Sequence, residues 1–295
     1  MNDRAGAGVL YVVATPIGNL GDLSARAVET LTQATRVAAE DTRRTRGLLT
    51  HLGLSKPIER LDAHASAHDI ARVVEHLQAG ETIALVTDAG TPVVSDPGTE
   101  LVRAAVEAGV HVVPIPGPSA VLTALVASGL SGGSFRFLGF LPRKGSERRD
   151  ELEKIRSTPE VVVLFESPER TLETLADLAR IMPQRRCVVA RELTKMHEEF
   201  VRGTLEELVR TLENRELLGE VTLVLGPAEK VGTPTMSDED LDRLIDAELG
   251  RGRRPRDVAD EVALVSGRSR RDVYTRVIER KRGMAADEGR TWKYD

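Results

Sequence analysis

The sequence has few of the residues that mark several common protein classes. One of its 295 residues is a cysteine, Cys187, so no disulfide can form within the chain and a reducing compartment is expected. Aromatic residues make up 3% of the chain, which argues against a protein that binds single strands by base stacking. It has no apolar run long enough to span a membrane, and its first residues lack the pattern of a signal peptide. We therefore expect a cytoplasmic protein that does not enter a membrane.

Motifs of several cofactor-dependent enzymes are also missing. Neither the G-x-G-x-x-G dinucleotide fingerprint nor the G-x-x-x-x-G-K-[ST] phosphate loop occurs, which removes the main support for nicotinamide or nucleoside triphosphate chemistry. His64 and His68 are four residues apart and would share a helix face, but only Asp69 accompanies them, so no metal site is expected. The net charge of -5 argues against a protein that coats nucleic acid indiscriminately.

Short apolar runs alternate with amphipathic segments from Val9 to about Leu130. Nearly continuous apolar strands separated by helices predict βα units and a parallel sheet covered on both faces. Small residues at 131–134 mark a boundary, after which strands are expected at 161–165, 186–190, 198–201 and 221–225. The strands at 186 and 198 are too close for a helical crossover, so they should pair antiparallel in a mixed sheet.

A polar linker near residue 230 leads to three expected helices, at 238–249, 255–265 and 269–281. The sequence thus predicts an α/β domain at 8–132, a second α/β domain at 133–228 and a helical module at 236–284. Arginines crowd into the last of these, which on an acidic protein favours a module that grips RNA phosphates, with a helix-turn-helix shape as one form. The alternative is a solvated charged face.

Three loops rich in turn-forming residues follow three of the expected strands: 15–22, 87–98 and 116–120. The second is longer than the roughly two to six residues that a βα connection needs. Because the carboxyl ends of parallel strands meet at one edge of a sheet, the three loops should converge and form a small-molecule site. Taken singly, each loop also fits an ordinary connection, a pair of turns or a helix cap.

These loops, in this order, resemble the tetrapyrrole methylase superfamily over roughly residues 8 to 228. The phrases that carry the resemblance are Ala14-Thr15-Pro16-Ile17-Gly18-Asn19-Leu20, Glu40-Asp41-Thr42-Arg43, the loop from Asp88 to Gly98, Gly139-Phe140-Leu141-Pro142-Arg143-Lys144, Phe165-Glu166-Ser167-Pro168-Glu169-Arg170 and Arg191-Glu192-Leu193-Thr194-Lys195. Relatives that act on corrins usually have Gly-Pro-Gly-Asp in the first loop. The chain looks more like the branch that methylates a cytidine ribose of 16S ribosomal RNA.

The resemblance implies two α/β domains with S-adenosyl-L-methionine in the cleft between them. It also implies a homodimer that acts on 16S rRNA within the small ribosomal subunit. The residues implied to contact the cofactor are Pro16, Gly18, Asp88, Ala89, Gly90, Ser95, Ser119 and Ala120 in the first domain, and Phe165, Leu193 and Gly219 in the second.

A ribose hydroxyl is a weak nucleophile until its proton leaves, so a base or a partner for the alkoxide is expected. The candidates are Asp41, His64, Lys144 and Glu166. Each also has a structural interpretation: a helix N-terminus, a surface histidine, an exposed helix start and a helix cap, respectively.

Basic residues near the expected cleft and in the tail are the candidates for RNA contacts. They are Arg43, Arg143, Arg148, Arg253, Arg254, Arg270 and Arg271. Two rival functions remain open: a methyltransferase acting on a tetrapyrrole or another small molecule, and a nonenzymatic RNA-binding or ribosome-assembly protein. The second rival would need degenerate cofactor loops, whereas these loops are intact.

Overall fold

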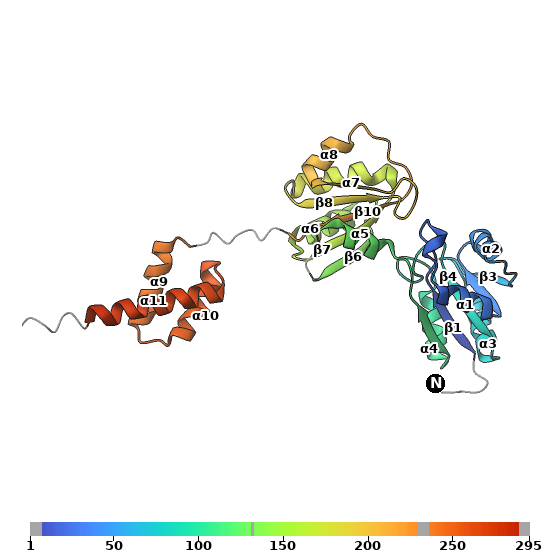
Figure 1. The fold of residues 1–295 in the computed structure, drawn as a ribbon, viewed down its shortest axis with the longest axis horizontal. Coiled ribbons are helices and arrows are strands. Elements are labelled where there is room, and N and C mark those ends of the chain that lie inside the picture. Colours follow the sequence, from blue (N-terminus) through green and yellow to red (C-terminus); the bar gives the residue numbers. More distant parts are fainter. Residues whose placement is uncertain (1–7, 131–132, 229–235, 289–295) are drawn as a thin grey trace, which may run out of the picture. The chain divides into compact units, whose positions relative to one another are not determined.

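The computed structural model describes residues 8–130, 133–228 and 236–288. The chain divides into two compact units, one ending at Ala228 and the other beginning at Glu229. The first unit contains two five-stranded sheets and the second contains three helices (Figure 1).

The first sheet is entirely parallel, as the sequence predicts, with strand order β3-β2-β4-β1-β5. Its strands are β1 (Val9–Val13), β2 (Arg36–Ala39), β3 (Ile58–Arg60), β4 (Thr82–Val86) and β5 (His111–Ile115). Its helices are η1 (Leu20–Asp22), α1 (Ala25–Gln33), α2 (Thr42–His51), α3 (Ala67–Gln78) and α4 (Thr99–Glu107). The edge strand β3 was not expected from the sequence, because its three residues give too short an apolar pattern.

Alternate residues of the buried strands face opposite sides of this sheet. Val37 of β2 packs with α1 and α2 on one side, whereas its neighbour Ala38 packs with α3 and α4 on the other. Both faces are therefore covered by helices, which explains why these strands are apolar throughout rather than alternating.

The second sheet is mixed, with strand order β6-β7-β10-β8-β9. Its strands are β6 (Phe135–Phe140), β7 (Val161–Glu166), β8 (Arg186–Arg191), β9 (Glu199–Thr204) and β10 (Val221–Leu225). The predicted antiparallel pairing of β8 with β9 is confirmed. Helices α6 (Ser146–Ser157), α7 (Pro168–Ile181) and α8 (Leu205–Leu212) bury one face of the sheet in a single apolar core.

Helix α5 (Ala120–Ser128) covers the other face of the second sheet (Figure 1). Its buried residues Val121, Ala124 and Leu125 pack against β7, β8 and β10. Helix α5, which falls within the predicted range 8–132, thus packs on the second sheet, and the chain passes from the first sheet to the second after β5. Helix α5 is almost wholly apolar, so its sequence did not indicate which sheet it would cover.

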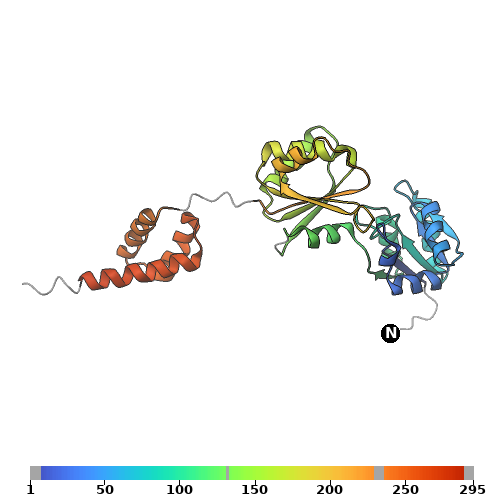
Figure 2. The same ribbon diagram turned by 45° about the horizontal axis from the view of Figure 1, so that its top comes forward.

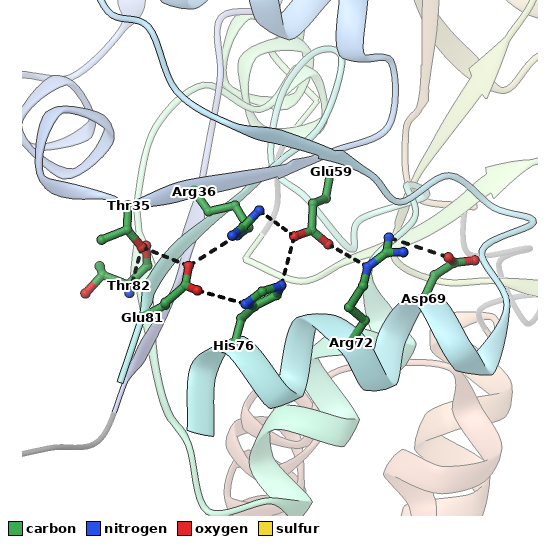
Figure 3. Close-up of polar contacts among 8 residues, drawn as sticks. All are labelled: Thr35, Arg36, Glu59, Asp69, Arg72, His76, Glu81 and Thr82. Carbon is green, nitrogen blue, oxygen red and sulfur yellow. Dashed lines mark hydrogen bonds and ion pairs between the residues drawn. The ribbon is translucent and has the colours of Figure 1, made fainter. Parts of the chain in front are cut away.

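An ion-pair network fastens α3 to the first sheet at the edge where β2 and β4 begin (Figure 3). Glu59 contacts Arg36, Arg72 and His76, and Glu81 contacts Arg36 and His76. The Arg36 guanidinium holds the pKa of Glu81 below its usual value. The network lies at the amino ends of the strands, away from the loops expected to bind a ligand, and we assign it a structural role.

The second unit is a three-helix module of α9 (Asp238–Gly250), α10 (Pro255–Ser266) and α11 (Arg270–Glu288), drawn from another side in Figure 2. Ile245, Val258 and Val277 are among its fully buried core residues. Ser237 and Ser269 each accept a hydrogen bond from the backbone three residues later, at Asp240 and Asp272, as predicted for helix starts. None of the helices in the described parts of the chain is long and apolar enough to cross a bilayer.

Candidate active site

A cavity of about 410 Å³ lies in the first unit, where loops after β1, β2, β4 and β5 meet the second sheet. We call it the main cavity. It is lined by Ile17, Glu40, Arg44, Asp88, Ala89, Gly90, Thr91, Val94, Ser95, Asp96, Ser119, Ala120, Val121, Phe140, Phe165, Glu166, Ser167, Pro168, Gly219, Glu220, Val221 and Thr222.

Hydrogen bonds between the three predicted loops hold together the part of the main cavity that they line. The backbones of Thr15 and Gly90 donate to each other at 2.8 and 3.0 Å, forming a bridge between the first and second loops. The Thr91 hydroxyl donates to the carbonyl of Pro118 in the third loop at 3.1 Å. The convergence predicted from strand order is therefore confirmed.

The loop between β4 and α4 has an unusual backbone. Val93 and Ser95 have positive φ angles of 75° and 63°. Non-glycine residues adopt such angles at a cost of about 1–3 kcal/mol, and they gather at ligand sites. A Cβ on Gly139 of β6 would lie 2.9 Å from the Ser95 hydroxyl, so that glycine allows the loop to approach the second sheet.

Three carboxylates, from Glu40, Asp88 and Asp96, line one side of the main cavity. Burial is the main cause that raises the pKa of Asp96 to about 6, and the charges of Glu40 and Asp88 add to it. Asp88 is held in place by the backbone N–H of Asp41 at 3.0 Å and by Arg44 at 3.5 Å. No group of three or more His, Cys, Asp or Glu side chains in the described ranges could hold a metal ion.

Gly219 and Glu220 form part of the wall that the second sheet contributes. Gly219 has a φ of +85°, and a Cβ there would lie 2.0 Å from the carboxylate of Glu192. Glu192 and Glu220 both accept hydrogen bonds from the Lys195 ammonium, at 2.8 and 3.1 Å. The Lys195 chain in turn packs where a Cβ of Gly18 would lie, so that this cluster ties the first loop to the second sheet.

Most of the residues expected to contact the cofactor line the main cavity. They are Asp88, Ala89, Gly90, Ser95, Ser119, Ala120, Phe165 and Gly219. Three others lie elsewhere. Pro16 lines a second, smaller cavity, Leu193 packs in the core beneath α5, and Gly18 makes room for Lys195.

The candidate bases are spread more widely. Glu166 lines the main cavity, but its side chain is 1% exposed and accepts hydrogen bonds from Ser167 and Thr174. Asp41 caps α2 and pairs with Arg43, whose hydrogen bond lowers the pKa of Asp41 to about 2. A carboxylate with so low a pKa is a weak proton acceptor.

His64 and Lys144 line neither cavity. His64 lies in the turn before α3, where its backbone N–H donates to Asp62, so it shares no helix face with His68. Lys144 and Arg143 are exposed between β6 and α6.

The candidate RNA contacts also differ in their surroundings: some are buried or paired, and others are exposed. Arg148 is 6% exposed, and its guanidinium binds Asp177, Thr174 and the Pro142 carbonyl. This burial corrects the expectation that Arg148 contacts a phosphate. Arg43 is exposed but paired with Asp41.

In the helical module, Arg253 pairs with Glu248 and Glu261, and Arg270 pairs with Asp260. Arg254 and Arg271 are exposed, and neither forms an ion pair with any residue that the structure describes. Of the acidic partners, Glu248 belongs to α9 and precedes the arginine-rich stretch that suggested phosphate binding.

Several residues of the main cavity were not anticipated as site residues. Glu40, Arg44, Asp96, Phe140 and Glu220 all line it. The sequence could have indicated Arg44 as a site residue, because it follows Glu40 by four residues at the start of a helix beside the site. Asp96 lay inside a loop already predicted to bind a ligand.

The second cavity has a volume of about 200 Å³ and lies beside α2. It is lined by Thr15, Pro16, Leu20, Arg44, Thr45, Gly47, Leu48, His51, Thr87 and Asp88. Arg44 and Asp88 also line the main cavity, so the two cavities adjoin.

Comparison with known proteins agrees with this architecture. Residues 9–209 match the family described as Tetrapyrrole (Corrin/Porphyrin) Methylases. A solved structure with the same fold is uroporphyrin-III C-methyltransferase from Thermus thermophilus complexed with S-adenyl homocysteine. That match has a TM-score of 0.54 and 20% identity, and covers 75% of this chain and 97% of that one. The expected fold class is confirmed.

Curated relatives are more similar in sequence. The chain is 43% identical to Ribosomal RNA small subunit methyltransferase I of Halalkalibacterium halodurans, over 92% of this chain and 95% of that protein. It is 44% identical to the protein of the same name from Thermotoga maritima, over 75% of this chain and 100% of that protein. The chain therefore belongs to the tetrapyrrole methylase family, and within it to the ribosomal RNA small subunit methyltransferase I group.

Proposed function

We propose that this protein transfers a methyl group from S-adenosyl-L-methionine to the 2′-hydroxyl of a cytidine ribose in 16S rRNA. The observation that carries the proposal is the 43% identity, over 92% of the chain, to a protein named for methylation of small-subunit rRNA. Because that RNA is cytoplasmic in bacteria, we propose that the protein acts there.

The main cavity suits this cofactor in size and chemistry. Its volume of about 410 Å³ falls within the range of roughly 300–1,000 Å³ typical of small-molecule sites. Phe165 and Ile17 offer apolar surface, while the Ser119 and Thr222 hydroxyls offer hydrogen bonds. Acidic side chains such as Asp88 complement the positive sulfonium and ammonium groups.

Bound S-adenosyl-L-methionine supplies an electrophilic methyl group on a positively charged sulfur. The protein must hold the ribose oxygen in line with that methyl and remove the hydroxyl proton. We propose that the carboxylate of Asp96 accepts this proton, since it lies in the cavity wall and its pKa of about 6 is close to the working pH. Glu40 and Asp88 support this role, because their charges favour the protonated form of Asp96.

The RNA is proposed to lie across exposed basic side chains. Arg143 and Lys144 are exposed on the loop that follows β6, whose last residue Phe140 lines the main cavity. Arg254 and Arg271 on the helical module are further candidates for phosphate contacts, which position an RNA rather than read its sequence. The assembled small subunit is the substrate that we would test first.

We also propose a homodimer. Leu122 and Val126 of α5 are 52% and 77% exposed, although the opposite face of this helix is buried against the second sheet. A helix that is apolar on all sides is normally covered on all sides, and a second copy of the chain would cover it here.

The test is calorimetric titration with S-adenosyl-L-methionine, followed by transfer of a tritiated methyl group to 30S subunits that lack the modification. Nuclease digestion then identifies the labelled nucleoside, and 2′-O-methylcytidine is the expected product. Binding without transfer to rRNA would instead favour a small-molecule acceptor. Absence of binding would refute a methyltransferase and leave the RNA-binding alternative.

A further inference from the structure

The second cavity, beside α2, is not the cavity proposed above to hold the cofactor. It adjoins the main cavity through Arg44 and Asp88, so a ligand in it would reach the place where the methyl group is transferred. We propose that it binds the acceptor nucleotide, with the pyrimidine base inside and the ribose at the junction of the two cavities. This inference rests on the proposed function and adds a substrate site to it.

The size and the walls of this cavity suit a nucleoside. Its volume of about 200 Å³ is half that of the main cavity. Pro16, Leu20 and Leu48 supply apolar surface against which a planar base can pack. Enzymes that act on one nucleotide of a folded RNA turn it out of its stack into such a pocket, where side chains stack on it and bind its edge.

The polar groups in these walls suit a nucleotide. The Asp88 carboxylate lies at the junction of the two cavities, where it can accept a hydrogen bond from a ribose hydroxyl. The Arg44 side chain is 64% exposed and lies at the junction, where a guanidinium can bind the adjacent phosphate. His51, about two turns further along α2, adds a second group able to donate a hydrogen bond.

Gly47 leaves open space beside the second cavity. It lies in the interior of α2, where glycine is less favourable than alanine, and it lines the second cavity. A Cβ at this position would meet no atom within 4 Å, and no positive φ requires glycine there. The space beside Gly47 is therefore open to a ligand in the second cavity.

The helix periodicity supports the same conclusion. Arg44, Gly47, Leu48 and His51 are spaced three or four residues apart, so they share one face of α2. Along that face lie, in order, the Arg44 guanidinium, the open space beside Gly47, the apolar Leu48 side chain and the His51 imidazole. These are the elements needed to bind a phosphate and a base side by side.

The test fills the cavity without disturbing the fold. Gly47→Ala and Gly47→Leu add side chains that favour a helix and project into the cavity. We expect Gly47→Leu to raise the KM for 30S subunits by about tenfold, with unchanged affinity for S-adenosyl-L-methionine. Gly250→Ala is the matched control, since it also adds a methyl group to a helical glycine that has no neighbour within 4 Å.

A second readout does not depend on transfer. Cytidine 5′-monophosphate should compete with 30S subunits for the wild-type protein and show saturation-transfer NMR signals that Gly47→Leu abolishes. If the wild-type protein methylates 30S subunits but Gly47→Leu has the same KM and the same NMR signals, the nucleotide site is refuted while the proposed function stands. If the wild-type protein transfers no methyl to 30S subunits, the proposed function fails and the nucleotide site fails with it.

Discussion

Replacing Asp96 with asparagine should stabilise the protein and inactivate it at the same time. Burial raises the pKa of this carboxyl from its ordinary value of 3.8 to about 6. The folded protein therefore holds a proton at Asp96 more tightly than the unfolded chain does. The stabilising effect of binding that proton is complete below pH 3.8 and is lost as the pH rises through about 6.

The size of the effect follows from the shift of about two pKa units. Such a shift corresponds to roughly 3 kcal/mol between protonation states. Because the carboxyl is only half buried, we halve this to about 1.5 kcal/mol. At pH 8 the Asp96→Asn variant, which carries no charge there, should unfold about 3–6 °C above the wild type. Near pH 4 the difference should almost vanish.

Thermal unfolding at both pH values measures this without any ligand. Asp150→Asn, on the exposed side of α6, is the control for loss of one negative charge. In the transfer assay, kcat/KM of the wild type should fall below pH 6, and Asp96→Asn should lower it about 10²–10⁴-fold. An equal change in melting temperature at both pH values would refute the desolvation argument, and unaltered kcat/KM would refute the catalytic role.

Three further changes test other parts of the structure. Arg148→Ala should lower stability by about 3 kcal/mol, because it removes a buried guanidinium that binds Asp177, Thr174 and the Pro142 carbonyl; denaturant unfolding would show this, and RNA affinity of the folded variant should not change. Deletion of residues 229–295 should keep S-adenosyl-L-methionine binding but weaken binding to 30S subunits and flatten its salt dependence, and loss of cofactor binding would contradict this. Val126→Glu should convert a dimer to a monomer in light scattering, whereas Val106→Glu on α4, which is also exposed, should not.

The first sheet, apart from its edge strand β3, was predictable because its signals are local. The other strands are apolar runs, the helices between them have their own periodicity, and parallel pairing follows from this alternation. The mixed second sheet followed from one short connection, that between β8 and β9. The position of α5 depends on a different kind of information. Because this helix is apolar on every side, its sequence does not indicate which side is buried. Its contact with Val163 and Val188 depends on the presence of both sheets.

The site also has features that follow from the local sequence and features that depend on residues distant in the chain. The loop from Asp88 to Gly98 was predicted to bind a ligand because its length and composition exceed what a connection requires. The acid–base properties of Asp96 within it depend on Glu40, more than fifty residues earlier in the chain, and on burial by the folded loop. Gly18 shows the opposite case. Its motif was predicted to contact the cofactor, whereas the group that the structure places against it is the Lys195 side chain.

The tail shows why a count of charges within a sequence window overstates the capacity to bind phosphate. Arg276 and Arg280 pair with Asp242 and Asp246 of α9, more than thirty residues away in sequence and adjacent in the folded module. Each such pair must separate before its arginine can neutralise a phosphate, so paired arginines contribute less to the salt dependence of RNA binding than exposed ones. Arg254 has no such partner among the residues described, so its loss should reduce that dependence more than the loss of Arg276. The RNA-binding surface proposed for the module is therefore expected where the acidic residues of α9 are absent.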